Sequence, residues 1–137
     1  MGTAIARELV GQGWTVAMAD INENKDLASE LGSKARFYNC NVADYDSQAK
    51  TFDQVFKDFG RIDALCANAG IVDRQSWYLL GHRGSDDLPP KPDTSTTDVD
   101  WKGILYGTYL ATHFMRKNKK PGGAIVATAS IAGVHRT

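Results

Sequence analysis

The feature that most constrains this chain is the regular alternation of helix-type and strand-type hydrophobic patterns. Apolar residues recur at helical spacing in four segments, residues 3–12, 25–31, 45–59 and 97–119. Between and after them lie apolar runs suited to strands, at residues 14–19, 35–39, 62–67 and 124–128. Most of these runs are apolar almost throughout, which is typical of strands covered on both faces. The order predicts an α/β fold, a doubly wound parallel sheet flanked by helices.

The predicted boundaries carry residues that start or stop regular structure. Asp44 is suited to cap the helix at 45–59, and Gly60 follows its end. Residues 70–97 differ from the rest because they are rich in Gly, Pro, Ser and Asp, and their prolines exclude a regular helix. We therefore predict one domain over residues 1–137 with an irregular loop at about 70–97.

Composition argues against several classes of partner. Sixteen basic and sixteen acidic residues give zero net charge, so we expect no nucleic-acid or membrane partner. The first residues lack a signal-peptide layout, so we expect a cytoplasmic protein. Cys40 and Cys66 lack the spacing of a metal site, and no metal is expected. We interpret both as buried free thiols rather than a disulfide, and the basic run at 116–120 as a solvated helix end.

An acidic residue closes the first predicted strand. Parallel strands bring their carboxyl ends to one edge of a sheet, where ligands of doubly wound folds bind. Asp20 at that edge could accept hydrogen bonds from ribose hydroxyls and would repel a 2′-phosphate. The alternative is a loop acid or a helix cap. Ile21, the next residue, is assigned to the same candidate cofactor site.

Small and polar residues close the other strands. Asn41 and Val42 could contact an adenine edge and face, although an Asx turn into the next helix is equally consistent. Asn68, Ala69 and Gly70 would let a cofactor approach closely, with Asn68 fixing the turn by bonding to the main chain. In the last such segment, "SIAG", Ser130 could orient a substrate oxygen or could be a turn residue only.

Five stretches taken together resemble one known family over essentially the whole chain. The five stretches are MGTAIA, the AD pair at residues 19–20, NVAD, NAG and ASIAG. Together they resemble the motifs of the short-chain dehydrogenase/reductase family, which has an NAD(P)-binding Rossmann fold. GILYGTYLA and GGAIVATASIAG are similar to its 15-hydroxyprostaglandin-dehydrogenase-like branch. The resemblance implies an oxidoreductase that moves hydride between a nicotinamide cofactor and a small secondary alcohol or ketone. Asp20 favours NAD(H) over NADP(H).

The same resemblance identifies family elements that the 137 residues do not contain. The family's glycine turn reads TGxxxGhG, where h is apolar. Met1 matches the position h, and Gly2 matches the last glycine. The resemblance therefore places Gly2 in the cofactor-binding site. Ser130 corresponds to the catalytic serine, but the YxxxK motif would follow Thr137. We expect a fragment without its first strand and C-terminal third, from a truncated gene model rather than a natural start. Loss of a central strand would leave two strand edges unpaired, and we expect no turnover from these residues alone.

A third departure lies inside the chain. The family carries an asparagine in an N-x-x-G element, where it holds a water linked to the catalytic lysine. Asp100 of "DWKG" takes that place here, and an ionised carboxylate accepts hydrogen bonds but donates none. Asp100 is therefore a candidate for the catalytic relay, and the alternative is an ordinary acid in the first turns of a helix.

Two other functions stay open at this point. A non-catalytic nucleotide-binding chain could pair with a full-length relative, or with its own copy, through the apolar, aromatic face of residues 97–119. A different enzyme of similar fold, such as a methyltransferase, would also place a ribose-binding acid at the strand end where Asp20 lies. The NAG and SIAG elements argue against the methyltransferase.

Overall fold

The predicted alternation of helices and strands is present in the computed structural model, which describes residues 1–73 and 80–131. In order, the elements are α1 (Gly2–Gly11), β1 (Val16–Asp20), α2 (Lys25–Leu31), β2 (Ala35–Asn39), α3 (Tyr45–Phe59), β3 (Ala64–Ala67), α4 (Gly103–Met115) and β4 (Ala124–Ala127). A π-helix, Thr97–Lys102, leads into α4, and 3-10 turns lie at Gly32–Lys34 and Leu80–His82. Residues 74–79 of the predicted loop lie outside the described residues.

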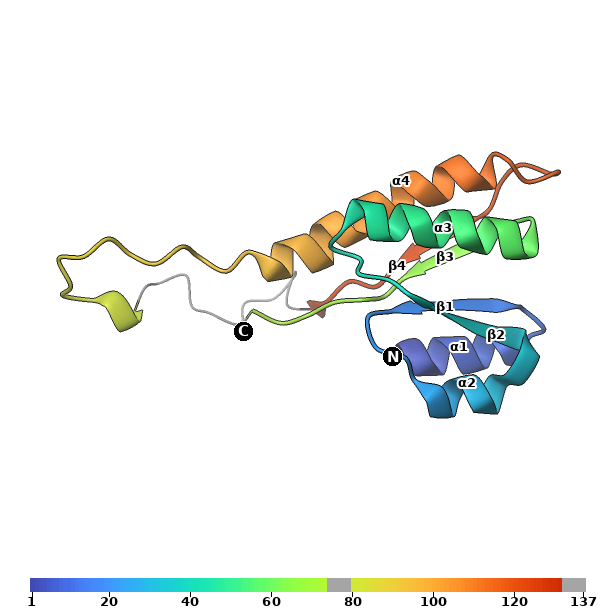
Figure 1. Ribbon diagram of the computed structural model, residues 1–137, viewed down its shortest axis with the longest axis horizontal. Coiled ribbons are helices and arrows are strands. Elements are labelled where there is room, and N and C mark those ends of the chain that lie inside the picture. Colours follow the sequence, from blue (N-terminus) through green and yellow to red (C-terminus); the bar gives the residue numbers. More distant parts are fainter. Residues whose placement is uncertain (74–79, 132–137) are drawn as a thin grey trace.

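The elements form three layers. Helices α3 and α4 lie on one side of the strands, and α1 and α2 lie on the other (Figure 1). Arg7 of α1 and Glu30 of α2 join the two helices by a bidentate ion pair, with nitrogen–oxygen distances of 2.7 and 2.6 Å. This layering is that of a Rossmann-type α/β domain.

The strands pair in parallel, as predicted, but not in one continuous sheet. β1 pairs with β2, Val16 lying opposite Ala35, and β3 pairs with β4, Ala64 lying opposite Ala124. Within the described part of the chain these are two separate two-stranded sheets. One edge of β1 and one edge of β3 therefore have no strand beside them among the described residues.

Local capping explains why several boundaries match the sequence so closely. The Asp44 carboxylate accepts a hydrogen bond from the Asp46 N–H at 3.0 Å, and Gly60 ends α3 in the left-handed conformation, with φ 72°. Asn24 caps α2 by accepting from the Leu27 N–H at 3.0 Å. The predicted helix at 97–119 was too long, because it starts as a π-helix and ends at Met115.

The main apolar core lies between α3, α4 and β3. Phe114 is at its centre, with ring centroids 6.0 Å from Phe52 and 5.4 Å from Phe56. Its other members are Val55, Ile62, Leu65, Ala111 and Met115. The buried face of α4 is thus built around Phe114 and small residues, and it is not the aromatic face noted in the sequence. Trp101 and Tyr109 of that face are 62% and 69% exposed.

A buried amide closes the connection between α4 and β4. Asn118 donates to the carbonyls of Ile62 and Gly122, at 2.8 and 3.2 Å, and accepts from the Ile62 N–H at 3.1 Å. Gly123 follows in a space without room for a side chain. A Cβ there would lie 2.7 Å from the Asp63 carbonyl oxygen.

Tyr38 connects β2 to α3. Its hydroxyl donates to Asp58 at 2.8 Å, and Arg36 pairs with the same carboxylate at 2.9 Å. Burial, together with this hydrogen bond, raises the pKa of Tyr38 to about 12. The hydrogen bond from Tyr38 lowers the pKa of Asp58.

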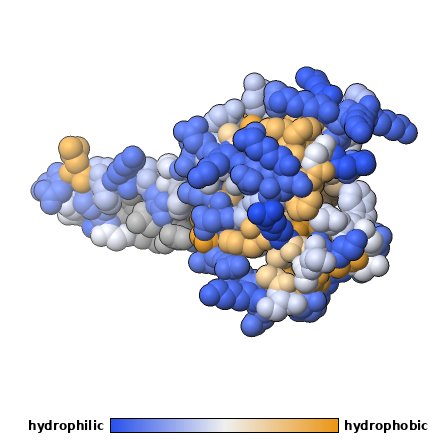
Figure 2. All heavy atoms as spheres, turned by 45° about the vertical axis from the view of Figure 1, so that its right-hand side comes forward, coloured by the Kyte–Doolittle hydropathy of each residue, from blue (hydrophilic) through white to orange (hydrophobic). Residues whose placement is uncertain are grey.

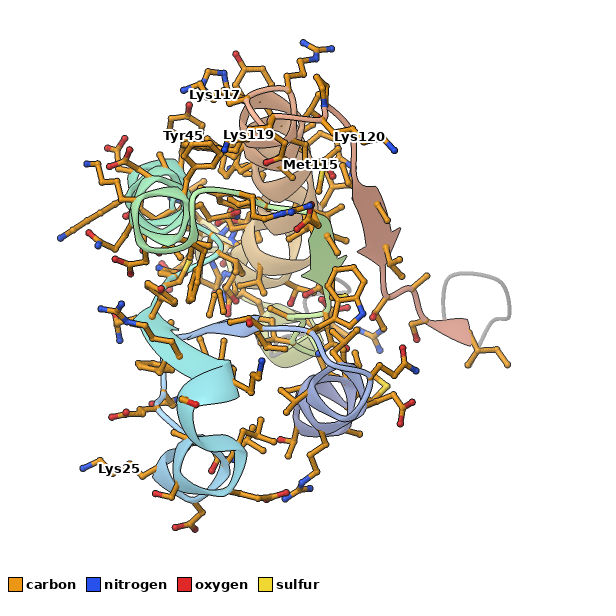
Figure 3. The ribbon with its side chains drawn as sticks, turned by 90° about the vertical axis from the view of Figure 1, so that its right-hand side faces the viewer. Lys25, Tyr45, Met115, Lys117, Lys119 and Lys120 are labelled. Carbon is orange, nitrogen blue, oxygen red and sulfur yellow. The ribbon has the colours of Figure 1, made fainter. Side chains whose placement is uncertain are left out.

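The face of the molecule seen in Figure 2 is mostly hydrophilic, with apolar patches between the hydrophilic groups. Lys117, Lys119 and Lys120 gather at the C-terminal end of α4, at one end of the molecule (Figure 3), and all three are exposed. Their position fits the interpretation of the basic run as a solvated helix end.

Candidate functional site

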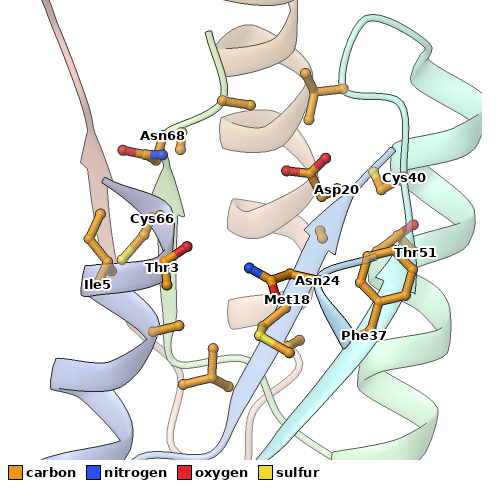
Figure 4. A pocket seen from close by; sticks show the side chains of 18 of the residues that line it. Thr3, Ile5, Met18, Asp20, Asn24, Phe37, Cys40, Thr51, Cys66 and Asn68 are labelled. Carbon is orange, nitrogen blue, oxygen red and sulfur yellow. The ribbon is translucent and has the colours of Figure 1, made fainter. Parts of the chain in front are cut away.

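A groove of about 920 Å³ runs between β1 and β3. Asp20 and Asn68 lie at the same end of it (Figure 4), which is where both strands end. Of the predicted site residues, the groove is lined by Gly2, Asp20, Val42, Asn68 and Ala69. The remaining ones, Ile21, Asn41, Gly70, Asp100 and Ser130, are not among its lining residues.

The groove is charged at its mouth and uncharged elsewhere. Asp20, Glu23, Lys25 and Asp26 are the charged side chains among its described lining residues, and all four lie between the end of β1 and the first turn of α2, which form the mouth of the groove. The rest of the lining is apolar or neutral. A ligand of the mouth therefore meets a net negative charge with one lysine beside it.

Asp20 is exposed and partly engaged by its own backbone. Its Oδ1 accepts a hydrogen bond from the Asn22 N–H at 3.0 Å, which is the turn that the loop-acid alternative predicts. Ile21 is 61% exposed, and its carbonyl accepts from Asn39 Nδ2 at 3.1 Å. The carboxylate is held at the strand end and still reaches solvent.

The segment after β2 forms the Asx turn that was the alternative to adenine binding. Asn41 Oδ1 accepts from the Ala43 N–H at 3.1 Å. Val42 packs against α4, since a Cβ on Gly103 would lie 3.2 Å from Val42 Cγ2. Gln48 fixes both segments by donating to the carbonyls of Val42 and Gly103, at 2.7 and 2.9 Å. The sequence analysis did not identify Gln48. Its one detectable sign was a polar residue at a helical position that falls on the buried side of α3.

Asn68 joins three elements at the end of the groove. Its Oδ1 accepts from the Thr128 hydroxyl at 3.2 Å, so the partner found is a side chain rather than the predicted main chain. Its Nδ2 lies 3.3 Å from the place of a Cβ on Gly2. Gly2 thus lets α1 begin close against the ends of β3 and β4. The first turn of α1 presents backbone N–H groups at this end, as an anion site requires.

Asp100 anchors the backbone that follows β3. Its Oδ1 accepts a hydrogen bond from the Ile71 N–H at 2.9 Å and lies 3.4 Å from the place of a Cβ on Gly70. Both alternatives from the sequence placed Asp100 on the long helix, and it lies in the π-helix at its start. The carboxylate thus acts as a hydrogen-bond acceptor for the loop after Asn68.

Ser130 lies past the end of β4 and is exposed. The rest of its SIAG element, from residue 132, lies outside the described residues. Cys40 and Cys66 are both free thiols, as predicted, but only Cys40 is buried, and Cys66 is exposed and lines the groove. The expectation that both are buried was wrong for Cys66, because its side chain lies at the groove rather than in the apolar core.

Comparison with known proteins agrees with this geometry. The family model for short chain dehydrogenases matches residues 1–137. The chain is 44% identical to the short-chain dehydrogenase/reductase prx6 of Penicillium rubens and covers 48% of that protein, using 100% of its own residues. It is 29% identical to human 15-hydroxyprostaglandin dehydrogenase [NAD(+)], with 98% of this chain and 47% of that protein aligned. The chain spans about half the length of these relatives. In the described ranges, no helix has the length and apolar content needed to cross a bilayer.

Proposed function

Since the chain belongs to the short-chain dehydrogenase/reductase family, we propose that the whole protein transfers hydride between NAD(H) and a secondary alcohol or ketone. The observation that carries the proposal is the joint position of Asp20 and Asn68 at one end of the groove, beside the first turn of α1. Strand ends and a helix N-terminus at one edge are what a dinucleotide needs. The cofactor supplies the hydride chemistry.

The residues divide into three proposed roles. Gly2 and the start of α1 would bind the phosphates by donating hydrogen bonds from backbone N–H groups. Asp20 would accept hydrogen bonds from the adenosine ribose. Ile21, Asn41 and Val42 would lie beside the adenine. Asn68, Ala69 and Gly70 would form the floor under the rest of the cofactor. Ser130 would orient the substrate oxygen, and Asp100 would hold the loop after β3 through Ile71. The Asx turn at Asn41 leaves its amide nitrogen for a ligand, since Oδ1 is the atom used.

Binding to residues 1–137 tests the cofactor assignment directly. We expect chemical-shift changes at Asp20 and Asn68 on addition of NADH, with affinity nearer millimolar than micromolar. NADPH should bind roughly fivefold more weakly, because two like charges about 4 Å apart in water repel by about 1 kcal/mol. Lys25 at the same mouth can offset part of that repulsion.

Matched variants distinguish the effect of the Asp20 carboxylate on cofactor preference from the effect of the overall negative charge at the mouth of the groove. Asp20→Ser should reduce the NADH preference to less than about twofold. Glu23→Gln removes another acid of the groove mouth and should leave the preference in place. Equal or tighter binding of NADPH to the unchanged chain would refute the NAD(H) assignment. Shifts of the same residues with S-adenosylmethionine but not NADH would favour a methyltransferase.

A second proposal, self-association through α4 and the π-helix before it, is supported by their exposed apolar face. Trp101, Leu105 and Tyr109 recur at a spacing of four residues and are all exposed. A shallow groove of about 460 Å³ on this face is lined by Leu105, Thr108, Tyr109, Thr112, His113 and Arg116. Contiguous exposed apolar residues mark interaction surfaces. Sedimentation equilibrium should show dimers that Tyr109→Lys abolishes and that Leu88→Lys, in the loop, leaves intact.

A further inference from the structure

A buried glutamine lies behind the part of the candidate site that is assigned to the adenine. Gln48, near the start of α3, is only 4% exposed, although its side chain ends in a polar amide. Buried polar groups are almost always hydrogen-bonded, because an unpaired one costs free energy. The partners of this amide therefore show what the fold uses it for.

The amide nitrogen of Gln48 bridges two segments that are far apart in the sequence. It donates to the Val42 carbonyl oxygen at 2.7 Å and to the Gly103 carbonyl oxygen, 55 positions along the chain, at 2.9 Å. The first carbonyl belongs to the loop after β2, and the second belongs to the start of α4. Both donor hydrogens of the amide are thus used to fix main chain.

Two glycines, one turn apart on α4, leave the space that this bridge occupies. A Cβ on Gly103 would lie 3.2 Å from Val42 Cγ2. A Cβ on Gly107 would lie 3.2 Å from Gln48 Oε1. The absence of side chains at these two positions lets α4 approach the loop closely, so that one amide can reach both carbonyls.

The other hydrogen bonds of the loop after β2 are local. Ser47 Oγ accepts from the Asn41 N–H at 2.9 Å, and the Asp44 N–H donates to the Asn41 carbonyl oxygen at 3.1 Å. These bonds set the shape of the turn, but they do not set its distance from α4. Among the described residues, Gln48 alone hydrogen-bonds both the loop and α4.

We propose that Gln48 is a positioning residue for the adenine end of the cofactor and that it acts through Val42. The inference rests on the proposed function, in which Val42 lies beside the adenine. Gln48 itself needs no contact with the cofactor. A wall that is held in place before binding avoids the entropy cost of ordering the loop when the cofactor arrives. Without the bridge the loop leaves α4 for part of the time, and the apparent affinity falls with the fraction that stays in place.

Binding of adenosine 5′-monophosphate to isotope-labelled residues 1–137 tests the proposal, because this probe carries the adenine and lacks the nicotinamide. Gln48→Met keeps the length and bulk of the side chain but has no donor. We expect its dissociation constant to rise roughly threefold to tenfold, which is the effect of one or two net hydrogen bonds. Gln54→Met is the matched control, since Gln54 lies on the same helix and donates to Asp58 at 2.9 Å on the exposed surface. It should leave the affinity unchanged.

Hydrogen exchange at the Asp44 amide supplies a readout that a merely structural role would not move. In the ligand-free Gln48→Met variant this amide should exchange faster than in the unchanged chain, because the loop is no longer held on α4. Saturating adenosine 5′-monophosphate should slow the exchange more in the variant than in the unchanged chain, since binding and loop ordering are linked reciprocally. An Asp44 amide with the same response to the nucleotide in both chains would overturn the proposal.

Failure of this inference is distinguishable from failure of the proposed function. Equal nucleotide affinity in Gln48→Met and the unchanged chain, or an equal loss in Gln54→Met, would overturn the role of Gln48 and leave the cofactor assignment standing. No binding of the nucleotide or of NADH to the unchanged chain would refute the cofactor assignment, and this inference with it. Amide shifts around Phe114 should be the same in Gln48→Met, and their loss would show that Gln48 supports the core instead.

Discussion

Removing the Asp100 carboxylate should release the backbone that follows β3. In Asp100→Ala, the Ile71 N–H loses an acceptor that lies 2.9 Å away in a half-buried position. A hydrogen bond to a charged group contributes about 1.5–3 kcal/mol. Tenfold in an opening equilibrium corresponds to about 1.4 kcal/mol, so the amide of Ile71 should exchange roughly ten to a hundred times faster.

Hydrogen exchange followed by NMR measures this effect at one amide and needs no global unfolding transition. Asp100→Asn keeps an acceptor oxygen but loses the charge, and should speed exchange by roughly fivefold, about 1 kcal/mol. Asp98→Asn is the control, because it removes a charge from the same π-helix, where Asp98 pairs with Lys102 at 2.6 Å. It should leave Ile71 unchanged. An Ile71 amide that already exchanges at the rate of an unstructured peptide, or one that is insensitive to Asp100→Ala, would refute the contact.

Two further predictions test packing and charge. Gly123→Ala should lower the free energy of unfolding in urea by about 1–3 kcal/mol, because its Cβ would lie 2.7 Å from the Asp63 carbonyl oxygen. In the control Gly11→Ala, the new Cβ meets nothing within 4 Å, so this variant should be neutral or stabilising. Tyr38 should make stability fall as pH rises from about 10 to about 12, because its folded pKa lies above that of a free tyrosine and the neutral form is the one the fold favours. Tyr38→Phe should remove this alkaline dependence and the hydrogen bond that lowers the pKa of Asp58. An unchanged alkaline profile in Tyr38→Phe would contradict the assignment.

Local signals explain which elements could be predicted from the sequence. The helix at 45–59 matches to the residue, because Asp44 and Gly60 fix its ends through caps that act over a few residues. The aromatic face of α4 could not be placed in the same way. Its rotation is set by Gly103 and Gly107, which pack closely against Val42 and Leu65, and hydropathy gives no weight to such close approach.

The same distinction applies to the candidate site. The position of Asp20 and Asn68 at one end follows from parallel strands alone, so pattern and topology were sufficient. The partners of Asp100 and Gln48 depend on residues 29 and 55 positions away, which no local pattern specifies. The sequence predicted two unpaired strand edges, but it did not predict that the strands divide into two separate sheets. The shape of the groove between them depends on how α1 and α4 pack, which requires the three-dimensional arrangement.

The division of the strands into two sheets has a consequence for how the domain comes apart. The ladder of β1 and β2 is closed by α1 and α2, and its buried apolar residues among those described are few: Ala6, Leu27, Tyr38 and, just after β2, Cys40. The ladder of β3 and β4 shares its helices with the phenylalanine core around Phe114. In the part of the chain that the structure describes, no backbone ladder joins the two, so each can open as a separate cooperative unit with its own free energy. Amides of β1 should then exchange through an opening that leaves those of β3 protected, and a single melting temperature would not describe the molecule.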